Sequence, residues 1–380
     1  MSKLCGAADT AGLLACRGWR STLQQFTPRL SEPMSALARK RVSLSQSDRP
    51  WQQAMRDAIT DVDTLFELLE LPRKALPGAR RAARLFDLRV PRGYVARMAR
   101  GDLADPLLRQ VLPLDAEHDD TPGFVFDAVG DGDSHVGHGL LHKYTSRALL
   151  VTTGACAIHC RYCFRRHFDY AAHQARRGPA GTALAPIAAD DRIDEVILSG
   201  GDPLSLSNAR LAAIGAGIDE IKHVKRLRIH SRTAVVLPER IDDGFVDWIA
   251  GRAQRTVIVI HANHARELDD AVAAALARLR DAGATLLNQA VLLRGVNDDV
   301  ETLAALSQRL FALGVLPYYL HLLDRVAGTA HFEVGPAQAQ TLIDRLAARL
   351  PGYLVPRLAR ESAGEGAKQV LGHRARNHSH

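Results

Sequence analysis

The chain has 380 residues, of which 47% are apolar, so it can bury the core of a large α/β barrel or of about two ordinary domains. No stretch approaches the roughly 18 apolar residues of a membrane-spanning helix, and no apolar signal region is present, so we expect a cytoplasmic protein with no membrane partner. The formal net charge is +7, and the five cysteines do not form a disulfide framework.

The first segment of the chain is basic. Residues 1–50 hold eight Lys/Arg, three Asp/Glu and seven Ser, a composition that is also typical of organellar transit peptides. We favour a disordered or mis-started extension over residues 1–48, with Met34 as an alternative start.

A small helical region is predicted over residues 49–122. Apolar residues recur at helical spacing from Trp51 to Leu71, and Pro72 ends this helix. Shorter helices are expected at 80–87, 91–100 and 102–112. The next segment, 123–144, begins with a run rich in Gly and Asp that is typical of a linker. Three residues just before the next strand could clasp a phosphate: Lys143, Tyr144 and Arg147.

Short apolar runs alternate with amphipathic helices from residue 145 onwards. The expected strands are 148–152, 195–198, 227–230, 256–260, 286–293 and 316–322, and the expected helices are 208–221, 268–282, 300–313 and 336–349. This alternation indicates a parallel sheet with crossover helices. We therefore predict an α/β fold, a partial or full (βα) TIM-like barrel over 145–358, with an open doubly wound sheet as the alternative. Residues 359–380 form a C-terminal segment.

Three cysteines follow the first expected strand, in the run Cys156-Ala-Ile-His-Cys160-Arg-Tyr-Cys163. A four-iron cluster held by three thiolates keeps one iron open, where a small molecule can bind and receive an electron. A zinc knuckle would need a second half-site, and a redox CxxC pair would leave Cys156 unexplained. The spacing thus favours an iron–sulfur cluster over zinc binding or simple packing.

Unusual residues follow each of the other expected strands. In chain order these are Ser199-Gly200-Gly201-Asp202, His230-Ser-Arg232, His261-Ala-Asn-His264, Gln289 with residues 294–298, and His321 with Asp324. Because the carboxyl ends of barrel strands carry the chemistry, we expect one shared active site. The Gly-Gly turn would let backbone approach a ligand, and its Ser and Asp could hold an amino group.

Three charged residues are candidates for handling a substrate. Arg165 belongs to a basic run beside the cysteines, with Arg161 and Arg166, and it suits a carboxylate. A charge run is usually a solvated face, and we keep that interpretation for one or two of the three arginines. Asp324 could pair with a cation, or else cap a helix. Lys368 follows a glycine-containing loop and could form a Schiff base, although a lone lysine is more often a surface residue.

Seven features of this chain occur together in one known family. They are CAIHCRYCFRRHF, LSGGDPL, RIHSRTAVVLPERI, HANH, LNQAVLLRGVND, PYYLHLLD and the late Lys368. In this order they resemble the lysine 2,3-aminomutase family of radical S-adenosylmethionine (radical SAM) enzymes, over roughly residues 50 to 372. The short C-terminus is most similar to the branch that makes (R)-β-lysine for the modification of elongation factor P.

The resemblance implies a role for each site residue. Cys156, Cys160 and Cys163 would bind a [4Fe–4S] cluster; Ser199, Gly200, Gly201, Asp202, His261 and Gln289 would surround S-adenosylmethionine; Lys368 would carry pyridoxal 5′-phosphate, with Lys143, Tyr144 and Arg147 near its phosphate. Arg165 would hold the substrate carboxylate and Asp324 the distal ammonium of L-lysine. The family's second ammonium-binding acid corresponds by position to Glu361, a longer side chain.

The implied reaction is a radical migration of the lysine amino group from the α- to the β-carbon. It implies a flavodoxin- or ferredoxin-type electron donor and a functional link to elongation factor P and its lysyl ligase. The alternatives are an aminomutase for glutamate or arginine, and a non-catalytic iron–sulfur or zinc protein that binds nucleic acid. Against the last, five of the seven net positive charges lie in residues 1–50, and aromatic residues are only 5% of the chain.

Overall fold

A computed structural model describes most of the chain. The described residues are 51–132, 135–137, 139–170, 181–362, 364–365 and 368–371. The expected extension 1–48, with Met34, lies outside them, as do parts of the expected linker and of the C-terminal segment.

Ten strands form one sheet in which each strand pairs with its neighbours in chain order. They are β1 (His135–Gly137), β2 (Leu140–Tyr144), β3 (Arg147–Thr153), β4 (Glu195–Gly200), β5 (Arg226–Ser231), β6 (Arg255–Ile260), β7 (Thr285–Val291), β8 (Leu316–His321), β9 (Arg357–Arg360) and β10 (Gln369–Val370). Strands β3 to β9 are parallel, and antiparallel β1–β2 and β10 flank them.

The strand order decides between the two predicted architectures. A doubly wound sheet reverses its strand order at a switch point, and this sheet does not. Among the described strands, β1 and β10 remain as edges, so the sheet is a partial barrel. The prediction of an α/β barrel is confirmed in its partial form.

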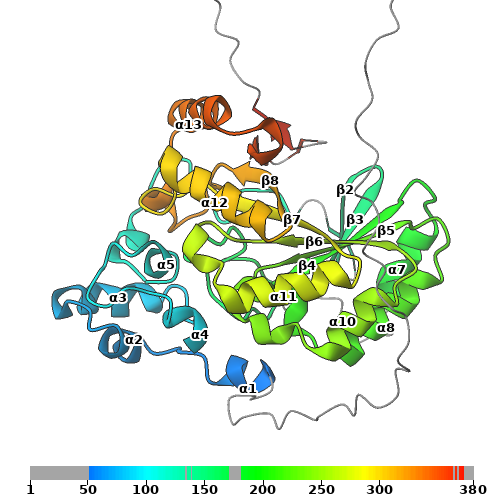
Figure 1. The fold of residues 1–380 in the computed structure, drawn as a ribbon, viewed down its shortest axis with the longest axis horizontal. Helices are drawn as coiled ribbons and strands as arrows, with labels where there is room; N and C mark the ends of the chain where they lie inside the picture. Colours follow the sequence, from blue (N-terminus) through cyan, green and yellow to red (C-terminus); the bar gives the residue numbers. More distant parts are fainter. Residues whose placement is uncertain are drawn as a thin grey trace, which may run out of the picture. The chain divides into compact units, whose positions relative to one another are not determined.

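Helices cover the outer face of the parallel strands (Figure 1). They are α7 (Gly181–Ala188), α8 (Asn208–Asp219), α9 (Thr233–Val236), α10 (Asp243–Ala250), α11 (Asp270–Asp281), α12 (Val300–Ala312) and α13 (Pro336–Arg349). Four of them begin where a side-chain oxygen accepts a hydrogen bond from a backbone amide of the first turn: Ser207, Asp242, Asp269 and Asp299. Three of these helices, α8, α11 and α12, were expected from periodicity and begin within two residues of their predicted starts. The fourth expected helix, α13, begins at Pro336 without a side-chain cap.

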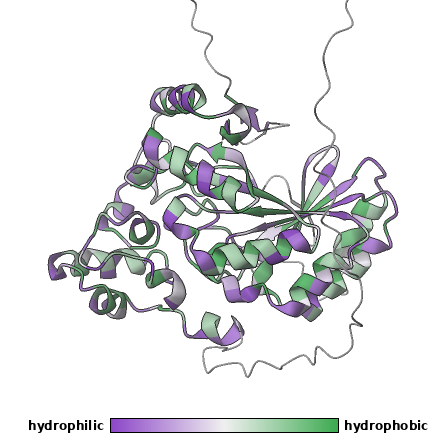
Figure 2. Cartoon of the chain, in the orientation of Figure 1, coloured by the Kyte–Doolittle hydropathy of each residue, from purple (hydrophilic) through white to green (hydrophobic). Residues whose placement is uncertain are grey.

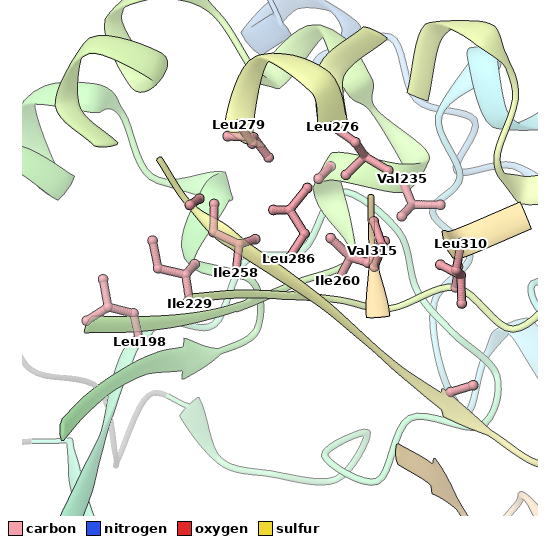
Figure 3. Packing of buried hydrophobic residues seen from close by; sticks show 14 of the residues in the cluster. Leu198, Ile229, Val235, Ile258, Ile260, Leu276, Leu279, Leu286, Leu310 and Val315 are labelled. Carbon is pink, nitrogen blue, oxygen red and sulfur yellow. The ribbon is translucent and has the colours of Figure 1, made fainter. Parts of the chain in front are cut away.

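Successive side chains along a strand point to opposite faces of the sheet, so one set packs in the core and the other faces the cavity. In β5, Leu227 and Ile229 are buried in the core, whereas Arg228 and His230 line a cavity on the inner face. Figure 3 shows Leu198, Ile229, Ile258 and Leu286 from adjacent strands beneath Leu276 and Leu279 of α11. Strands are coloured mostly hydrophobic and helices mixed in Figure 2, as this arrangement requires.

The N-terminal helical region is more broken than its periodicity predicts. Its helices are α1 (Trp51–Arg56), α2 (Val62–Leu68), α3 (Leu76–Ala83), α4 (Arg92–Val95) and α5 (Pro106–Arg109). The single helix expected from Trp51 to Leu71 is wrong because Ile59 exchanges two backbone hydrogen bonds with Val90 (2.8 and 2.9 Å), after which Asp61 caps a new helix. A backbone bridge to a residue 31 positions away leaves no trace in local apolar spacing.

Part of the expected linker packs on the barrel. Val125 forms a parallel bridge with Val326, and its amide donates to the Arg325 carbonyl at 2.9 Å. Farther along, Asp131 is only 3% exposed. Residues 123–132 therefore contribute to the inner wall of the barrel.

Candidate active site

A cavity of about 270 Å³ opens on the inner face of the sheet, toward the carboxyl ends of its strands. Each residue to which the resemblance assigns a role lines it: Lys143, Tyr144, Arg147, Cys156, Cys160, Cys163, Arg165, Ser199, Gly200, Gly201, Asp202, His261, Gln289, Asp324, Glu361 and Lys368. His264 and residues 294–298, which were expected at the same rim, are not among its lining residues. The structure thus brings together residues that are up to 225 positions apart, from Lys143 to Lys368.

The cysteine loop follows β3 and forms one wall. Cys156, Cys160 and Cys163 are free thiols. Burial raises the pKa of Cys156 well above its usual value and that of Cys163 to about 11, so a bound metal must displace protons from these two thiols.

The number of cysteines in the loop suits a four-iron cluster with one open iron. A zinc knuckle requires its ligands around one ion. A four-iron cluster instead takes each thiolate on a different iron, and three free cysteines along one cavity wall fit that group.

Two arginines beside the cysteines anchor the loop. Arg161 is fully buried and donates from Nε to Glu117 Oε1 at 2.8 Å and from Nη1 to the Phe86 carbonyl at 2.7 Å. Arg166 donates to Glu117 Oε2 at 2.7 Å. The interpretation of this basic run as a solvated face is therefore wrong, because both guanidinium groups pair with one buried carboxylate.

The Gly200-Gly201 turn lies against the backbone of the cysteine loop. A Cβ on Gly200 would lie 2.5 Å from the Thr153 carbonyl oxygen, and one on Gly201 2.5 Å from the Ala155 carbonyl oxygen. The Gly201 amide donates to the Thr153 carbonyl at 2.7 Å. The close approach expected from this sequence is thus made to the protein itself, and it joins two walls of the cavity.

Asp202 has a different role from the one expected. Its carboxylate accepts hydrogen bonds from the Leu204, Arg232 and Thr233 amides and from the Ser231 hydroxyl, at 2.8–3.1 Å, and the residue is 4% exposed. Its oxygens are occupied within the protein, so the side chain fixes the loop after β5 rather than being free for an amino group.

A chain of alternating charges crosses the cavity. Arg165 Nε lies 2.7 Å from Asp131 Oδ2, and Asp131 Oδ1 lies 2.9 Å from Lys143 Nζ. Glu361 then lies between the two lysines, 3.7 Å from Lys143 Nζ and 3.2 Å from Lys368 Nζ. This network ties the cysteine loop, β2 and the C-terminal segment to one another.

The network fixes the charge state of Asp131 and the direction of Arg165. Burial alone would raise the pKa of Asp131, but Arg165 and Lys143 hold it below its usual value, so the carboxylate is ionised. Arg165 also donates from Nη1 to Ser199 Oγ at 3.2 Å and to the Gly200 carbonyl at 3.3 Å.

Asp324 lies in the same cavity with a strongly altered pKa. Burial and the neighbouring Glu361 raise its pKa to about 7, against the opposing effect of Lys368. The nearby His261 has its pKa lowered to about 3 by burial and by Arg232, and its Nε2 lies 3.2 Å from the Tyr162 hydroxyl. The histidine is therefore a neutral hydrogen-bonding group.

The three residues expected near a phosphate, Lys143, Tyr144 and Arg147, differ in how far their side chains are already engaged within the protein. The Arg147 guanidinium stacks on the Tyr144 ring, 3.8 Å from its centroid. Lys143 has three acceptors: the two carboxylates and the Val129 carbonyl at 2.8 Å. Arg147 is thus the more available cation of the two.

Sequence reasoning missed several cavity residues. Asp131 lay in the expected linker, Tyr162 and Tyr170 lay within or just beyond the cysteine motif, and Arg232 was noted only as a residue after a strand. For Tyr162 and Tyr170 the available signal was an aromatic residue within or near the cysteine motif. For Arg232 it was an arginine directly after a strand. Asp131 had none.

Comparisons with known proteins point to one family. A family model described as the radical SAM superfamily matches residues 150–306. The L-lysine 2,3-aminomutase of Escherichia coli is 47% identical over 86% of this chain and 95% of its own length. That of Haemophilus influenzae is 42% identical over 86% and 96%, and that of Clostridium subterminale 31% identical over 84% and 76%.

Two solved structures align with part of the chain. A radical SAM methyltransferase from Sphaerobacter thermophilus has a TM-score of 0.42 at 16% identity, covering 58% of this chain and 68% of its own. Coproporphyrinogen III oxidase from Escherichia coli has a TM-score of 0.36 at 13% identity, covering 59% and 54%. Among the described residues, no helix has the length and apolar character needed to cross a bilayer.

Proposed function

This chain belongs to the L-lysine 2,3-aminomutase family of radical SAM enzymes, which are isomerases, and we propose that it converts L-lysine to (R)-β-lysine with its own Lys368, Arg165 and Asp324. The observation that carries this proposal is a single cavity that holds the three cysteines together with Lys368, Arg165 and the carboxylates of Asp324 and Glu361. The family implies a [4Fe–4S] cluster and S-adenosylmethionine.

The cofactors perform the difficult chemistry: the cluster and S-adenosylmethionine supply a radical that removes hydrogen from the β-carbon, and pyridoxal phosphate lets the amino group migrate. The protein supplies placement. Cys156, Cys160 and Cys163 would hold the cluster, while Ser199, the Gly-Gly backbone, His261 and Gln289 line the wall where S-adenosylmethionine would bind.

Arg165 and a pair of carboxylates in the same cavity suit the two ends of lysine. Arg165, held by Asp131 at 2.7 Å, is oriented to receive the substrate carboxylate. Asp324 and Glu361 offer two carboxylates for the distal ammonium. A glutamate side chain at this end would meet two acids, so the acid pair disfavours a glutamate mutase.

Lys368 is the residue we propose to carry pyridoxal phosphate. It is partly buried, with a side chain 22% exposed, and pairs with Glu361 at 3.2 Å. Arg147 and Lys143 would lie near the phosphate. Bond formation requires a neutral amine, so Lys368 must give up its proton, and with it the ion pair to Glu361.

Two partners follow from this activity. The reaction needs a low-potential electron donor, for which we propose a flavodoxin- or ferredoxin-type protein. We further propose that the product serves the modification of elongation factor P through a lysyl ligase. The support is the 47% identity to the E. coli enzyme, compared with 31% to the clostridial one.

The test is anaerobic incubation of the reconstituted protein with dithionite as the reductant, S-adenosylmethionine, pyridoxal phosphate and either L-lysine, L-arginine or L-glutamate. We expect β-lysine from lysine alone, measured by mass spectrometry after derivatisation. Formation of a β-amino acid only from arginine or glutamate would overturn the substrate assignment.

Lys368→Ala tests the cofactor lysine separately. We expect this variant to lose the near-ultraviolet absorbance of bound pyridoxal phosphate while keeping its iron, because the cysteine loop is untouched. Persistence of that absorbance in the variant would show that another lysine carries the cofactor, whatever the substrate is.

A further inference from the structure

Arg232 makes a contact with a cluster ligand that the proposed reaction does not explain. It follows β5, is 6% exposed, and lines the cavity. Its Nη1 lies 2.9 Å from Cys160 Sγ and also contacts the Tyr162 hydroxyl. A buried guanidinium thus points at one of the three sulfur atoms.

Hydrogen bonds from the other terminal nitrogen, Nη2, fix the orientation of the Arg232 guanidinium. Nη2 donates to Gln110 Oε1 at 2.8 Å and to Glu267 Oε2 at 3.1 Å, and both partners are fully buried. The Arg232 amide donates to Asp202 at 2.8 Å. With partners from three separate segments, Arg232 cannot turn away from the sulfur without breaking buried hydrogen bonds.

We propose that Arg232 is a positioning residue that raises the reduction potential of the cluster held by Cys156, Cys160 and Cys163. Reduction adds one electron from a reduced flavin or iron–sulfur donor, and the thiolate sulfur atoms become more negative. A hydrogen bond and a positive charge at Cys160 Sγ stabilise that reduced state more than the oxidised one. The inference rests on cluster binding by this family and not on the identity of the amino-acid substrate.

Arg161 provides a matched comparison within the same loop. It is adjacent to Cys160 in the chain and is fully buried, but its guanidinium donates to Glu117 and to the Phe86 carbonyl. It carries the same charge and is likewise buried, but its donors face a carboxylate and backbone carbonyls rather than a cysteine sulfur. If substitution of Arg232 changed the reduction potential only by loosening the loop, substitution of Arg161 should change the potential as well.

Glu267 provides a control in which a negative charge is removed instead of a positive one. Its carboxylate holds Nη2 of Arg232, and it also accepts from the Asn263 and His264 amides at 2.8 and 3.0 Å. Glu267→Gln perturbs the same buried network but removes a negative charge. Electrostatics predicts that this variant raises the cluster potential or leaves it unchanged, whereas loss of structure would lower it in both variants.

The experiment is a potentiometric titration of anaerobically reconstituted protein, followed by the electron paramagnetic resonance signal of the reduced cluster, without amino-acid substrate. Iron and sulfide analysis establishes equal cluster content. For Arg232→Met we expect about a tenfold smaller equilibrium constant for one-electron reduction, a midpoint lower by about 59 mV. Arg232→Lys keeps the charge and should fall between Met and wild type, while Arg161→Lys should match wild type.

A full cluster with an unchanged midpoint in Arg232→Met would overturn the proposal, and so would an equal lowering in Arg161→Lys or Glu267→Gln. If Arg232→Met does not hold a cluster, the other two variants decide. A lower midpoint in Arg232→Lys without any lowering in Glu267→Gln supports the proposal, and any other combination overturns it. If the variants show the expected midpoint shifts but the wild-type protein forms no β-lysine, only the substrate assignment is contradicted.

Discussion

Asp324 is the residue whose charge should control lysine affinity. Burial, Glu361 and Asp131 raise the pKa of this carboxyl, and Lys368 and Lys143 lower it. The net result is a pKa of about 7. An ammonium ion binds the ionised carboxylate, which is the dominant form only above this pKa. We therefore expect the KM for lysine to rise about tenfold per pH unit below pH 7, with a much smaller effect on kcat, since bound substrate keeps the acid ionised.

Asp324→Asn checks this assignment. The variant should lose about 2–5 kcal/mol of substrate binding and also lose the pH dependence of KM near neutrality. Burial and nearby cations lower the pKa of His230, His261 and His321, to about 3 for His261, so these rings do not titrate in this range. An unchanged inflection near pH 7 in Asp324→Asn would assign it to another group.

Residue types at motif positions were predictable, but their pairings were not. The spacing of Cys156 to Cys163 and the glycine pair carry local information, and the structure places all of them in the cavity. Asp131 carries none, because Arg165 lies 34 residues away along the chain and the pair exists only once β2 and the cysteine loop are in place. The occupation of the Asp202 carboxylate by backbone amides was hidden for the same reason.

The turn after β4 is the element on which the cysteine loop depends. A methyl group on Gly201 would lie 2.5 Å from the Ala155 carbonyl oxygen, at backbone that cannot rotate away. Because Gly201 does not have a positive φ, Gly201→Ala tests crowding alone. We expect a loss of about 1–3 kcal/mol in the free energy of unfolding and a lower iron content after reconstitution.

The matched control is Gly352→Ala, in the 3₁₀ turn Gly352–Leu354, where nothing lies within 4 Å of an added Cβ. Urea denaturation and iron analysis should leave this variant close to wild type. If Gly201→Ala binds a full complement of iron with unchanged stability, the two walls of the cavity are not joined as tightly as the hydrogen bonds indicate.

Elements with strong periodicity and caps were the most predictable. Strands β3 to β8 and helices α8, α11, α12 and α13 lie where the apolar pattern places them, because each buries one face against the same core. The N-terminal helices were less predictable. Their lengths are set by long-range contacts such as the Ile59–Val90 bridge, which interrupt a continuous apolar pattern.

At the scale of the whole molecule, the helical region and the barrel meet at the cysteine loop. Arg161 and Arg166 come from the loop, and Glu117 comes from the helical region; all three side chains are at most 1% exposed. Gln110 of the same region also reaches Arg232. The helical region thus supports the loop through these buried contacts, and its stability should be linked to that of the cluster site.

Glu117→Ala tests this linkage. The change leaves two buried guanidinium groups without their carboxylate, so we expect a loss of about 3–5 kcal/mol in the free energy of unfolding. Because the anchored loop holds the cluster ligands, urea denaturation followed by circular dichroism and by cluster absorbance should shift together to lower urea. Asp63→Asn, which breaks the exposed pair with Arg80 in the same region, should shift neither, since solvent screens that pair. Separate transitions for the two probes in Glu117→Ala would mean that the helical region unfolds independently of the loop it supports.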